Sequence, residues 1–229
     1  MDFNYSIMNS STCQVEEPLG IEDGRISDDQ ITASSVFTSS HANHGASNAR
    51  LNRPAQSGTT GAWSALSRDA NQWIQTNLGH SMVVTGVKIQ GRSEGGQWVT
   101  QFKVQYSNDG NSWTFVQQTN NQGDMIFEGN TDHTTVVTNC FPTQVTAAYI
   151  RIVPTAWNIW ISLRFELLGC EGTYIMFILL WLFSVYTDGN LLLLSGGFTL
   201  VPWQSSPLSD SSNCVAILYD PSLGLFRAL

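Results

Sequence analysis

The sequence predicts an all-β protein: a sandwich or barrel of about eight antiparallel strands, followed by an irregular hydrophobic tail. Short runs in which apolar and polar residues alternate recur between turn signals up to residue 170. No convincing amphipathic helix interrupts them. Only 12% of the residues are charged, while Thr, Ser, Asn and Gln are plentiful, which is typical of an extracellular β-rich domain with a polar surface.

The candidate strands follow one another with loops between them. The first lies around Ile31 and leads into a polar loop at residues 38–48, which has no large apolar side chain at its tip. An irregular stretch at 49–61 contains Pro54 and two glycines, which break regular structure. The remaining candidate strands are 73–78, 82–89, 102–106, 113–116, 125–127, 134–141, 149–153 and 161–170.

Residues 161–170 form the last and clearest of these strands. Three apolar residues alternate with Arg164 and Glu166, which predicts a half-buried strand with its charged residues on the outer face. We expect Arg164, and Arg151 in the preceding strand, to meet carboxylates on that face.

The tryptophans are expected to serve the fold. We assign Trp98, which precedes a strand, to the core rather than to a platform for a ligand. Five others are expected to pack in the core or to cap the ends of the sandwich: Trp63, Trp73, Trp113, Trp157 and Trp160.

Four cysteines could form two disulfide bonds, and their spacing alone does not fix the pairing. We favour a bond between Cys13 and Cys170, with Cys140 as a buried free thiol and Cys214 unpaired; other pairings stay open. A structural disulfide bond indicates an oxidising compartment, and therefore an extracellular or cell-surface protein. Two N-glycosylation triplets, beginning at Asn4 and Asn9, agree with this location.

The two ends of the chain differ from the part between them. Residues 1–12 lack the features of a signal peptide and are expected to be a disordered leader, so the chain reads as a piece of a longer secreted protein or as a partial gene product. Residues 171–229 contain a run of 13 mostly apolar residues at 174–186, too short to span a bilayer. Extending the run to about 20 residues would include Asp188, and a charged side chain within a membrane span is energetically costly. We expect a poorly ordered tail, with a membrane-associated segment as the alternative.

Charge and motifs argue against three classes of function. Residues 13–170 carry 9 basic and 13 acidic side chains, which argues against nucleic acid and against attraction to anionic membranes. No catalytic motif is present, and the four histidines are scattered without an obvious nucleophile. We therefore expect no enzymatic activity.

Several motifs follow one another in a characteristic order. They are Cys13, Pro18-Leu19-Gly20, Gln30-Ile31-Thr32-Ala33-Ser34-Ser35, Ala49-Arg50-Leu51-Asn52, Trp63, Trp73-Ile74-Gln75, Phe127-Glu128-Gly129-Asn130, Tyr149-Ile150-Arg151 and Leu163-Arg164-Phe165-Glu166 with Gly169-Cys170. This order resembles the discoidin domain, also called the coagulation factor V/VIII type C domain, and is nearest to its neuropilin-type and factor V/VIII-type members. The resemblance covers residues 13–170. It implies a distorted jelly-roll sandwich of the galactose-binding-like class, whose ends are joined through Cys13 and Cys170, with ligand-binding loops clustered at one end.

The resemblance also implies a binding module, whose ligand the fold does not name. Members of this family bind phospholipid headgroups, collagen, glycans or peptides. Lipid-binding members insert large apolar side chains from protruding loops, whereas the corresponding loops here, 38–44 and 92–97, have no apolar tip. We therefore do not expect membrane insertion by these loops.

The neuropilin-type members hold the C-terminal arginine of a peptide in a pocket. That pocket maps onto Phe37, His41, Ser64, Arg68, Ser93 and Gln97. Arg68 stands where the acidic partner of the ligand would be, with Asp69 beside it, so an acidic or sialylated group suits this pocket better than an arginine.

The full candidate ligand-binding set is polar, which suits a polar peptide or a sugar. It comprises Phe37, His41, Asn43, His44, Ser64, Arg68, Asp69, Arg92, Ser93, Glu94, Gln97 and Trp98. No metal site is expected, although Asn43, Asn48 and Asn52 are weak candidates for holding calcium. Two functions follow: an extracellular adhesion module for a cell-surface or matrix protein, or a lectin-like module for glycans that calcium assists.

Overall fold

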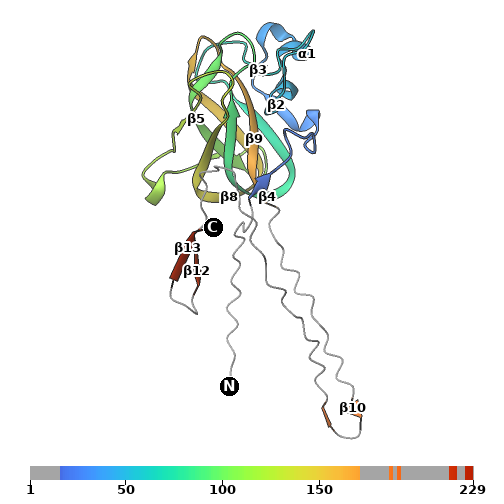
Figure 1. Cartoon of the computed structure of the whole chain (residues 1–229), viewed down its shortest axis with the longest axis vertical. Helices are drawn as coiled ribbons and strands as arrows, with labels where there is room; N and C mark the ends of the chain where they lie inside the picture. Colours follow the sequence, from blue (N-terminus) through green and yellow to red (C-terminus); the bar gives the residue numbers. More distant parts are fainter. Residues whose placement is uncertain (1–15, 171–185, 188–189, 192–216, 221–224, 229) are drawn as a thin grey trace. The chain divides into compact units, whose positions relative to one another are not determined.

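The computed structural model describes residues 16–170, together with four short strands at 186–187, 190–191, 217–220 and 225–228. Residues 16–170 form a β-sandwich in which the long strands β4, β8 and β9 run side by side (Figure 1). Its strands are β1 (Glu17–Pro18), β2 (Ile31–Ala33), β3 (Trp63–Ser64), β4 (Ile74–Gln90), β5 (Trp98–Ser107), β6 (Thr114–Phe115), β7 (Phe127–Glu128), β8 (Val137–Asn158) and β9 (Ser162–Cys170). Short helical turns connect them: η1 (Asp28–Gln30), η2 (Phe37–Ser39), α1 (His41–His44), η3 (Ala46–Asn48) and η4 (Thr119–Asn121).

The strands are paired antiparallel in the order β1-β9-β4-β8-β5-β6, with β2 added to β4, β3 to β9 and β7 to β5. The predicted all-β jelly-roll class is therefore confirmed. Large apolar side chains, among them Trp63, Phe102, Phe127 and Phe165, are almost completely buried between the layers. Their burial is the main source of stability in such a fold.

Two strands are longer than the sequence predicts. β4 joins the expected strands 73–78 and 82–89, and β8 joins 134–141 and 149–153. The register between β4 and β8 shifts between Asn77 and Met82, next to Gly79, whose φ of 81° lets the strand bend without ending. The first part of β4 pairs with residues 149–152 of β8. The last part of β4 pairs with residues 137–140 of β8 and also with β9, so β4 and β8 both contribute to both layers of the sandwich.

The closing strand β9 is buried on both faces, and the prediction of a half-exposed strand is wrong. Arg164 is only 3% exposed, and its guanidinium donates to the carbonyl oxygens of Gly91 at 2.7 Å, Arg53 at 2.9 Å and His133 at 3.1 Å. Burial lowers the pKa of Arg164 to about 10. Loop carbonyls replace the carboxylates that we expected as its partners, because loops cover this face of the strand.

Glu166 has the complementary role on the same strand. It is 1% exposed and accepts hydrogen bonds from the backbone N–H groups of Ile21 at 3.1 Å, Glu22 at 2.8 Å and Leu167 at 2.8 Å. Burial raises the pKa of Glu166, while these backbone donors oppose the rise. Glu166 therefore fixes the segment after β1 onto the closing strand.

Arg151 also lacks the predicted carboxylate. Its guanidinium carbon lies 4.1 Å from the ring centroid of Trp73 and 3.7 Å from that of Trp113, and its Nε and Nη2 both donate to Gln75 Oε1. Of the two expected positions for Trp73 and Trp113, the core is wrong, because these half-buried rings hold an arginine between them. Trp63 and Trp157 do pack in or against the core.

The cysteine prediction is wrong in one respect. Cys140 lies in β8 and is half-buried rather than deep in the core, and both Cys140 and Cys170 are disulfide-bonded. Cys140 is therefore not the free thiol that we expected. Cys13 and Cys214 lie outside the described residues, so the pairing of Cys13 with Cys170 stays a prediction.

Most of the residues on which the tail predictions rest lie outside the described part of the chain, as does the predicted leader at 1–12. Within the tail, β10 (Tyr186–Thr187) pairs antiparallel with β11 (Asn190–Leu191), and β12 (Ile217–Asp220) with β13 (Leu225–Ala228). Among the described residues, no helix has the length and apolar character needed to cross a membrane.

Candidate functional site

Four side chains from three connections between strands meet at one end of the sandwich: Phe37 and His44 lie between β2 and β3, Arg68 between β3 and β4, and Trp160 between β8 and β9. The ring of Phe37 lies edge-on to the rings of His44 and Trp160, with centroids 5.1 Å and 5.2 Å apart. The guanidinium carbon of Arg68 lies 4.9 Å from the Trp160 ring centroid, and its Nη1 donates to the carbonyl of Ile159 at 3.3 Å. Trp160 Nε1 donates to the carbonyl of Ala65, which fixes the ring that the others share.

The backbone around this cluster is strained. Thr38, Ser39 and Ile159 have φ values of 52°, 55° and 59°, in the left-handed region that disfavours side chains branched at Cβ. Within the described part of the chain, the only other non-glycine residues with positive φ are two asparagines, which tolerate it. Strain of this kind persists only where the surrounding structure holds it, and it is common at ligand-binding loops.

Two exposed apolar side chains border the cluster, and sequence reasoning missed both. Leu66 is 50% exposed and Ile159 is 60% exposed. Loops 38–44 and 92–97 have no apolar tip, whereas the exposed apolar side chains lie in the loops at 65–69 and 158–160. Leu66 comes directly before the polar residues Ser67, Arg68 and Asp69, which was the available signal. Ile159 lies between Trp157 and Trp160, where the sequence suggests a core residue.

Several predicted pocket residues are linked by hydrogen bonds to one another or to Ser162. Ser64, 1% exposed, shares a hydrogen bond of 2.8 Å with Ser162, whose hydroxyl donates to Gln97 Oε1 at 3.0 Å. Arg92 Nη1 donates to the same Gln97 oxygen at 3.1 Å. Burial lowers the pKa of Arg92. These residues support the loop end from inside.

Thr60 connects the remaining loops. Its hydroxyl donates to the carbonyl of Asn43 at 2.7 Å and lies 3.4 Å from His44 Nδ1, while its own carbonyl accepts from the Ser93 hydroxyl at 3.4 Å. Burial, and secondarily the charge of Arg92, lower the pKa of His44 below its ordinary value. Both effects favour the neutral form of the His44 imidazole.

Three predicted site residues stand apart from the cluster. Asp69 accepts from Gln72 Nε2 at 3.0 Å and from the backbone N–H of Asn71 at 2.9 Å, and these hydrogen bonds lower its pKa. Its carboxylate thus stabilises a turn. His41 is exposed, with Nδ1 3.2 Å from the carbonyl oxygen of Ser39, and Glu94 is exposed at the tip of its loop.

Two of the three candidate calcium ligands, Asn48 and Asn52, donate hydrogen bonds from their amide nitrogens. Asn48 is buried and donates to the carbonyl of Ala42 at 2.9 Å, which closes the turn after α1. Asn52 Nδ2 donates to Glu22 Oε1 at 2.9 Å. Among the described residues, no group of three or more His, Cys, Asp or Glu side chains is placed to hold a metal ion.

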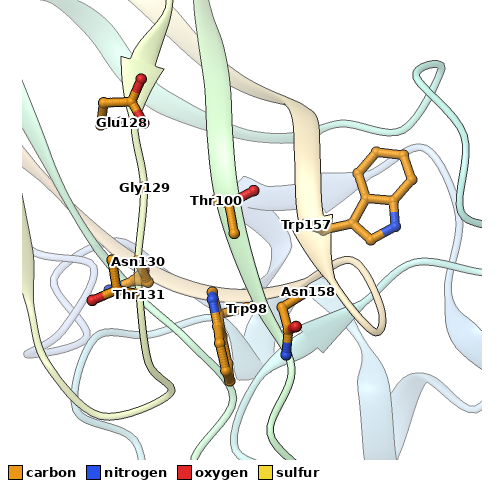
Figure 2. A pocket seen from close by; sticks show the side chains of 8 residues that line it. All are labelled: Trp98, Thr100, Glu128, Gly129, Asn130, Thr131, Trp157 and Asn158. Atoms are coloured by element: carbon orange, nitrogen blue, oxygen red, sulfur yellow. The ribbon is translucent and has the colours of Figure 1, made fainter.

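Trp98 does not belong to the cluster around Trp160 and is not in the core, so its assignment to the core is wrong. It is half-buried and lines an open groove of about 430 Å³ (Figure 2). The groove runs between the start of β5, the chain after β7 and the end of β8, and its lining residues are Trp98, Thr100, Glu128, Gly129, Asn130, Thr131, Trp157 and Asn158. The Trp157 side chain points away from the others in Figure 2, in agreement with its packing against the core.

Comparisons with known proteins agree with this architecture. The F5/8 type C domain family matches residues 30–167. Lactadherin of Sus scrofa is 42% identical over 158 residues, which is 67% of this chain and 38% of lactadherin. Human retinoschisin is 35% identical over 162 residues, which is 69% of this chain and 70% of retinoschisin.

A solved structure shows the same likeness. Recombinant discoidin II of Dictyostelium discoideum matches with a TM-score of 0.53 and 27% identity, over 62% of this chain and 55% of that chain. The matched region spans well under half of lactadherin, so the activity of that whole protein is not carried over. From the family match, the relatives and the shared fold, this chain belongs to the F5/8 type C domain family.

Proposed function

We propose that this chain is a non-catalytic, extracellular binding module that mediates adhesion to a cell-surface or matrix ligand. The ligand would bind at the loop end, defined as Phe37, His44, Leu66, Arg68, Ile159 and Trp160. Membership of the F5/8 type C family supports the class of function. The location of the site is our proposal from geometry.

The observation that carries the proposal is strain combined with exposure. Ile159 is 60% exposed in the left-handed backbone region, and Thr38 and Ser39 are strained in the neighbouring loop. Leaving a large apolar side chain in water gives up about 1.5–3 kcal/mol of burial energy, and the backbone conformation costs about 1–3 kcal/mol more. A partner that covers Ile159 and Leu66 would offset both costs.

Arg68 suggests the chemistry of the partner. It is exposed, one face of its guanidinium lies over Trp160, and no carboxylate of the described residues pairs with it. A guanidinium forms two parallel hydrogen bonds with a carboxylate, and the attraction strengthens where water is excluded. The loop end therefore suits an acidic side chain or chain terminus flanked by apolar residues.

The experiment measures binding of the secreted full chain to cultured cells and to immobilised matrix proteins. Leu66→Ser and Arg68→Glu should each weaken binding roughly tenfold, or about 1.4 kcal/mol. Ile126→Ser is the matched control, because Ile126 is also exposed, at 47%, but lies next to β7 outside the loop end. Unchanged binding by both loop-end variants would show that the site is misplaced.

Two further measurements test the other ligand classes, glycans and phospholipids. A glycan array with and without chelator tests the lectin-like alternative, which predicts sugar binding that chelation abolishes. Liposomes containing phosphatidylserine test insertion of Leu66 and Ile159 into a bilayer. Liposome binding that Leu66→Ser removes, without binding to any protein ligand, would replace the adhesion proposal.

A further inference from the structure

Two Asp-Gly pairs lie at bends of the sandwich, Asp23-Gly24 in the segment after β1 and Asp109-Gly110 between β5 and β6. Such pairs are prone to isomerisation, because glycine has no side chain to hinder attack of its backbone nitrogen on the carboxyl carbon of the preceding aspartate. A fold prevents this attack where hydrogen bonds engage the nitrogen and the carboxyl group. A third pair, Asp188-Gly189, lies outside the described residues.

The nitrogen that would attack Asp109 is engaged. The Gly110 N–H donates to Ser107 Oγ at 2.9 Å. The hydroxyl group of Ser107, which is 3% exposed, in turn donates to Asp109 Oδ1 at 2.9 Å. A Cβ at Gly110 would lie 3.3 Å from the Tyr149 ring, so this ring restricts rotation of the peptide unit. Both reacting groups are therefore held in place.

The Asp109 carboxylate has further donors. It accepts from the backbone N–H groups of Ser112 and Asn111, both at 2.8 Å, and from the Ser112 hydroxyl group at 3.0 Å. These hydrogen bonds lower the pKa of Asp109. The protonated acid is the form that can lose its hydroxyl group as water, so a lowered pKa makes the reactive form scarce.

The Asp23 pair is much less constrained. Gly24 is exposed with a φ of 84°, a Cβ added there would meet nothing within 4 Å, and its N–H has no hydrogen-bond partner among the described residues. The Asp23 carboxylate accepts only from Arg25, from the backbone N–H at 3.0 Å and from Nε at 2.8 Å, and these bonds lower its pKa. The two side chains are 61% and 53% exposed, and an ion pair in solvent contributes little, so it opens readily.

The base of this loop is closed independently of its tip. The Ile26 N–H donates to the carbonyl of Gly20 at 2.8 Å. Arg50 Nη1 donates to the carbonyls of Ile21 at 2.5 Å and Ile26 at 2.9 Å, and Glu166 accepts from the Ile21 N–H. One additional methylene in the main chain at residue 23 therefore changes the tip without releasing the loop from the closing strand.

We propose that Asp23-Gly24 is a site of spontaneous isomerisation in the folded chain, and that the fold protects Asp109-Gly110. The Gly24 nitrogen loses its proton and attacks the Asp23 carboxyl carbon. A C–N bond forms, the C–OH bond breaks, and one water leaves, which gives a cyclic succinimide. Water then adds to a succinimide carbonyl. Addition at the main-chain carbonyl carbon of Asp23 breaks its bond to Gly24 and leaves isoaspartate, whereas addition at the side-chain carbonyl restores aspartate.

The test is incubation of the secreted full chain at neutral pH and body temperature in water enriched in oxygen-18, followed by digestion in ordinary water and peptide mass mapping. Each passage through the succinimide introduces one oxygen-18 atom. The peptide that contains Asp23 should therefore gain label with time, while the peptide that contains Asp109 gains none. Methylation by an isoaspartyl methyltransferase, which leaves ordinary aspartate unmodified, measures the isoaspartate fraction separately. In urea both peptides should gain label, because protection of Asp109 requires the fold.

Two variants test the two sites. Asp23→Glu keeps the negative charge but requires a six-membered ring, so the label at residue 23 should be lost. Ser107→Ala removes the acceptor of the Gly110 N–H and one donor to Asp109, so Asp109 should begin to gain label. If Ser107→Ala does not fold, the comparison of the native and urea-unfolded wild type carries the test. The adhesion function plays no part in either measurement.

The proposal is overturned if Asp109 gains label as fast as Asp23 in the folded wild type. It is equally overturned if Asp23 gains none in the folded chain while both residues gain label in urea. A folded Ser107→Ala chain without label at Asp109 would contradict the protection described for that pair.

Discussion

Two arginines on different parts of the sandwich each contact tryptophan, but only one has capacity left for a partner. Arg151, on the outer face of β8, lies between Trp73 and Trp113, and two of its nitrogens donate to Gln75. Arg68, at the loop end, lies over Trp160 alone and makes one hydrogen bond of 3.3 Å. Both faces of the Arg151 guanidinium are covered, whereas the Arg68 guanidinium leaves most of its donors to solvent.

The difference separates charges that stabilise the fold from charges that are available for binding. Arg164 is the extreme case, because backbone carbonyls surround it and it is almost completely buried. The number of satisfied donors and the exposed fraction, rather than the residue type, distinguish a structural arginine from a ligand-binding one. The charged groups therefore differ in how much each contributes to folding.

Replacing Arg164 should have the largest effect. Arg164→Leu leaves the carbonyls of Gly91, Arg53 and His133 buried without this donor, and we expect a loss of about 3–5 kcal/mol in the free energy of unfolding or failure of secretion. Secretion yield and urea unfolding measure it. A stable, secreted variant would show that Arg164 does not hold these loops.

Glu166→Gln should have the next largest effect. The amide places an N–H group where one carboxylate oxygen now accepts from Ile21, Leu167 or Glu22, so at least one buried N–H loses its acceptor. We expect a loss of about 1–3 kcal/mol by urea unfolding. Glu22→Gln, at an exposed neighbouring side chain, is the control and should change little. Equal stability of the two variants would contradict this role.

Removing the charge of Arg151 should have a smaller effect. Arg151→Met keeps the apolar stem between the two indole rings but loses the cation–π contacts and the hydrogen bonds to Gln75, so we expect a loss of about 1–2 kcal/mol. Thermal unfolding of the secreted chain measures it. No change would indicate that packing alone holds Trp73 and Trp113 at this position.

His44 makes stability weakly dependent on pH. Its pKa is lower in the fold than the ordinary value of 6.5, so below that value the unfolded chain binds protons more readily than the folded chain. Stability at the loop end should therefore fall as the pH drops from 7.5 toward and below 6. His44→Gln should remove this part of the dependence, and the difference between the two unfolding curves measures it. Parallel curves would contradict a depressed pKa.

The fold was largely predictable because its signals are local. Alternation identified the strands, and the motif order identified the family. The predicted breaks within β4 and β8 were wrong because a residue such as Gly79 bends a strand without ending it, and only pairing with neighbours reveals which happens. The half-exposed reading of β9 failed for a related reason: loops distant in sequence cover its second face.

The candidate site was only partly predictable. The resemblance predicts Phe37 and Arg68, the polar loop set adds His44, and these side chains do meet, but Trp160, which joins them, was expected only to pack in the core or cap a sandwich end. Leu66 and Ile159 were missed because an isolated apolar residue looks the same in sequence whether a loop buries or exposes it. The strain at Thr38 and Ile159 has no signature in composition or spacing.

The central claim, that the loop end is a binding surface and not a structural element, is tested most directly by measuring stability and cell binding together for Arg68→Glu and Arg151→Met. We predict that Arg68→Glu changes the free energy of unfolding by about 0.5 kcal/mol or less while binding falls roughly tenfold. Arg151→Met should show the reverse, a loss of stability with binding preserved at temperatures where the chain stays folded. Binding retained by Arg68→Glu, or lost only in proportion to stability, would contradict the account.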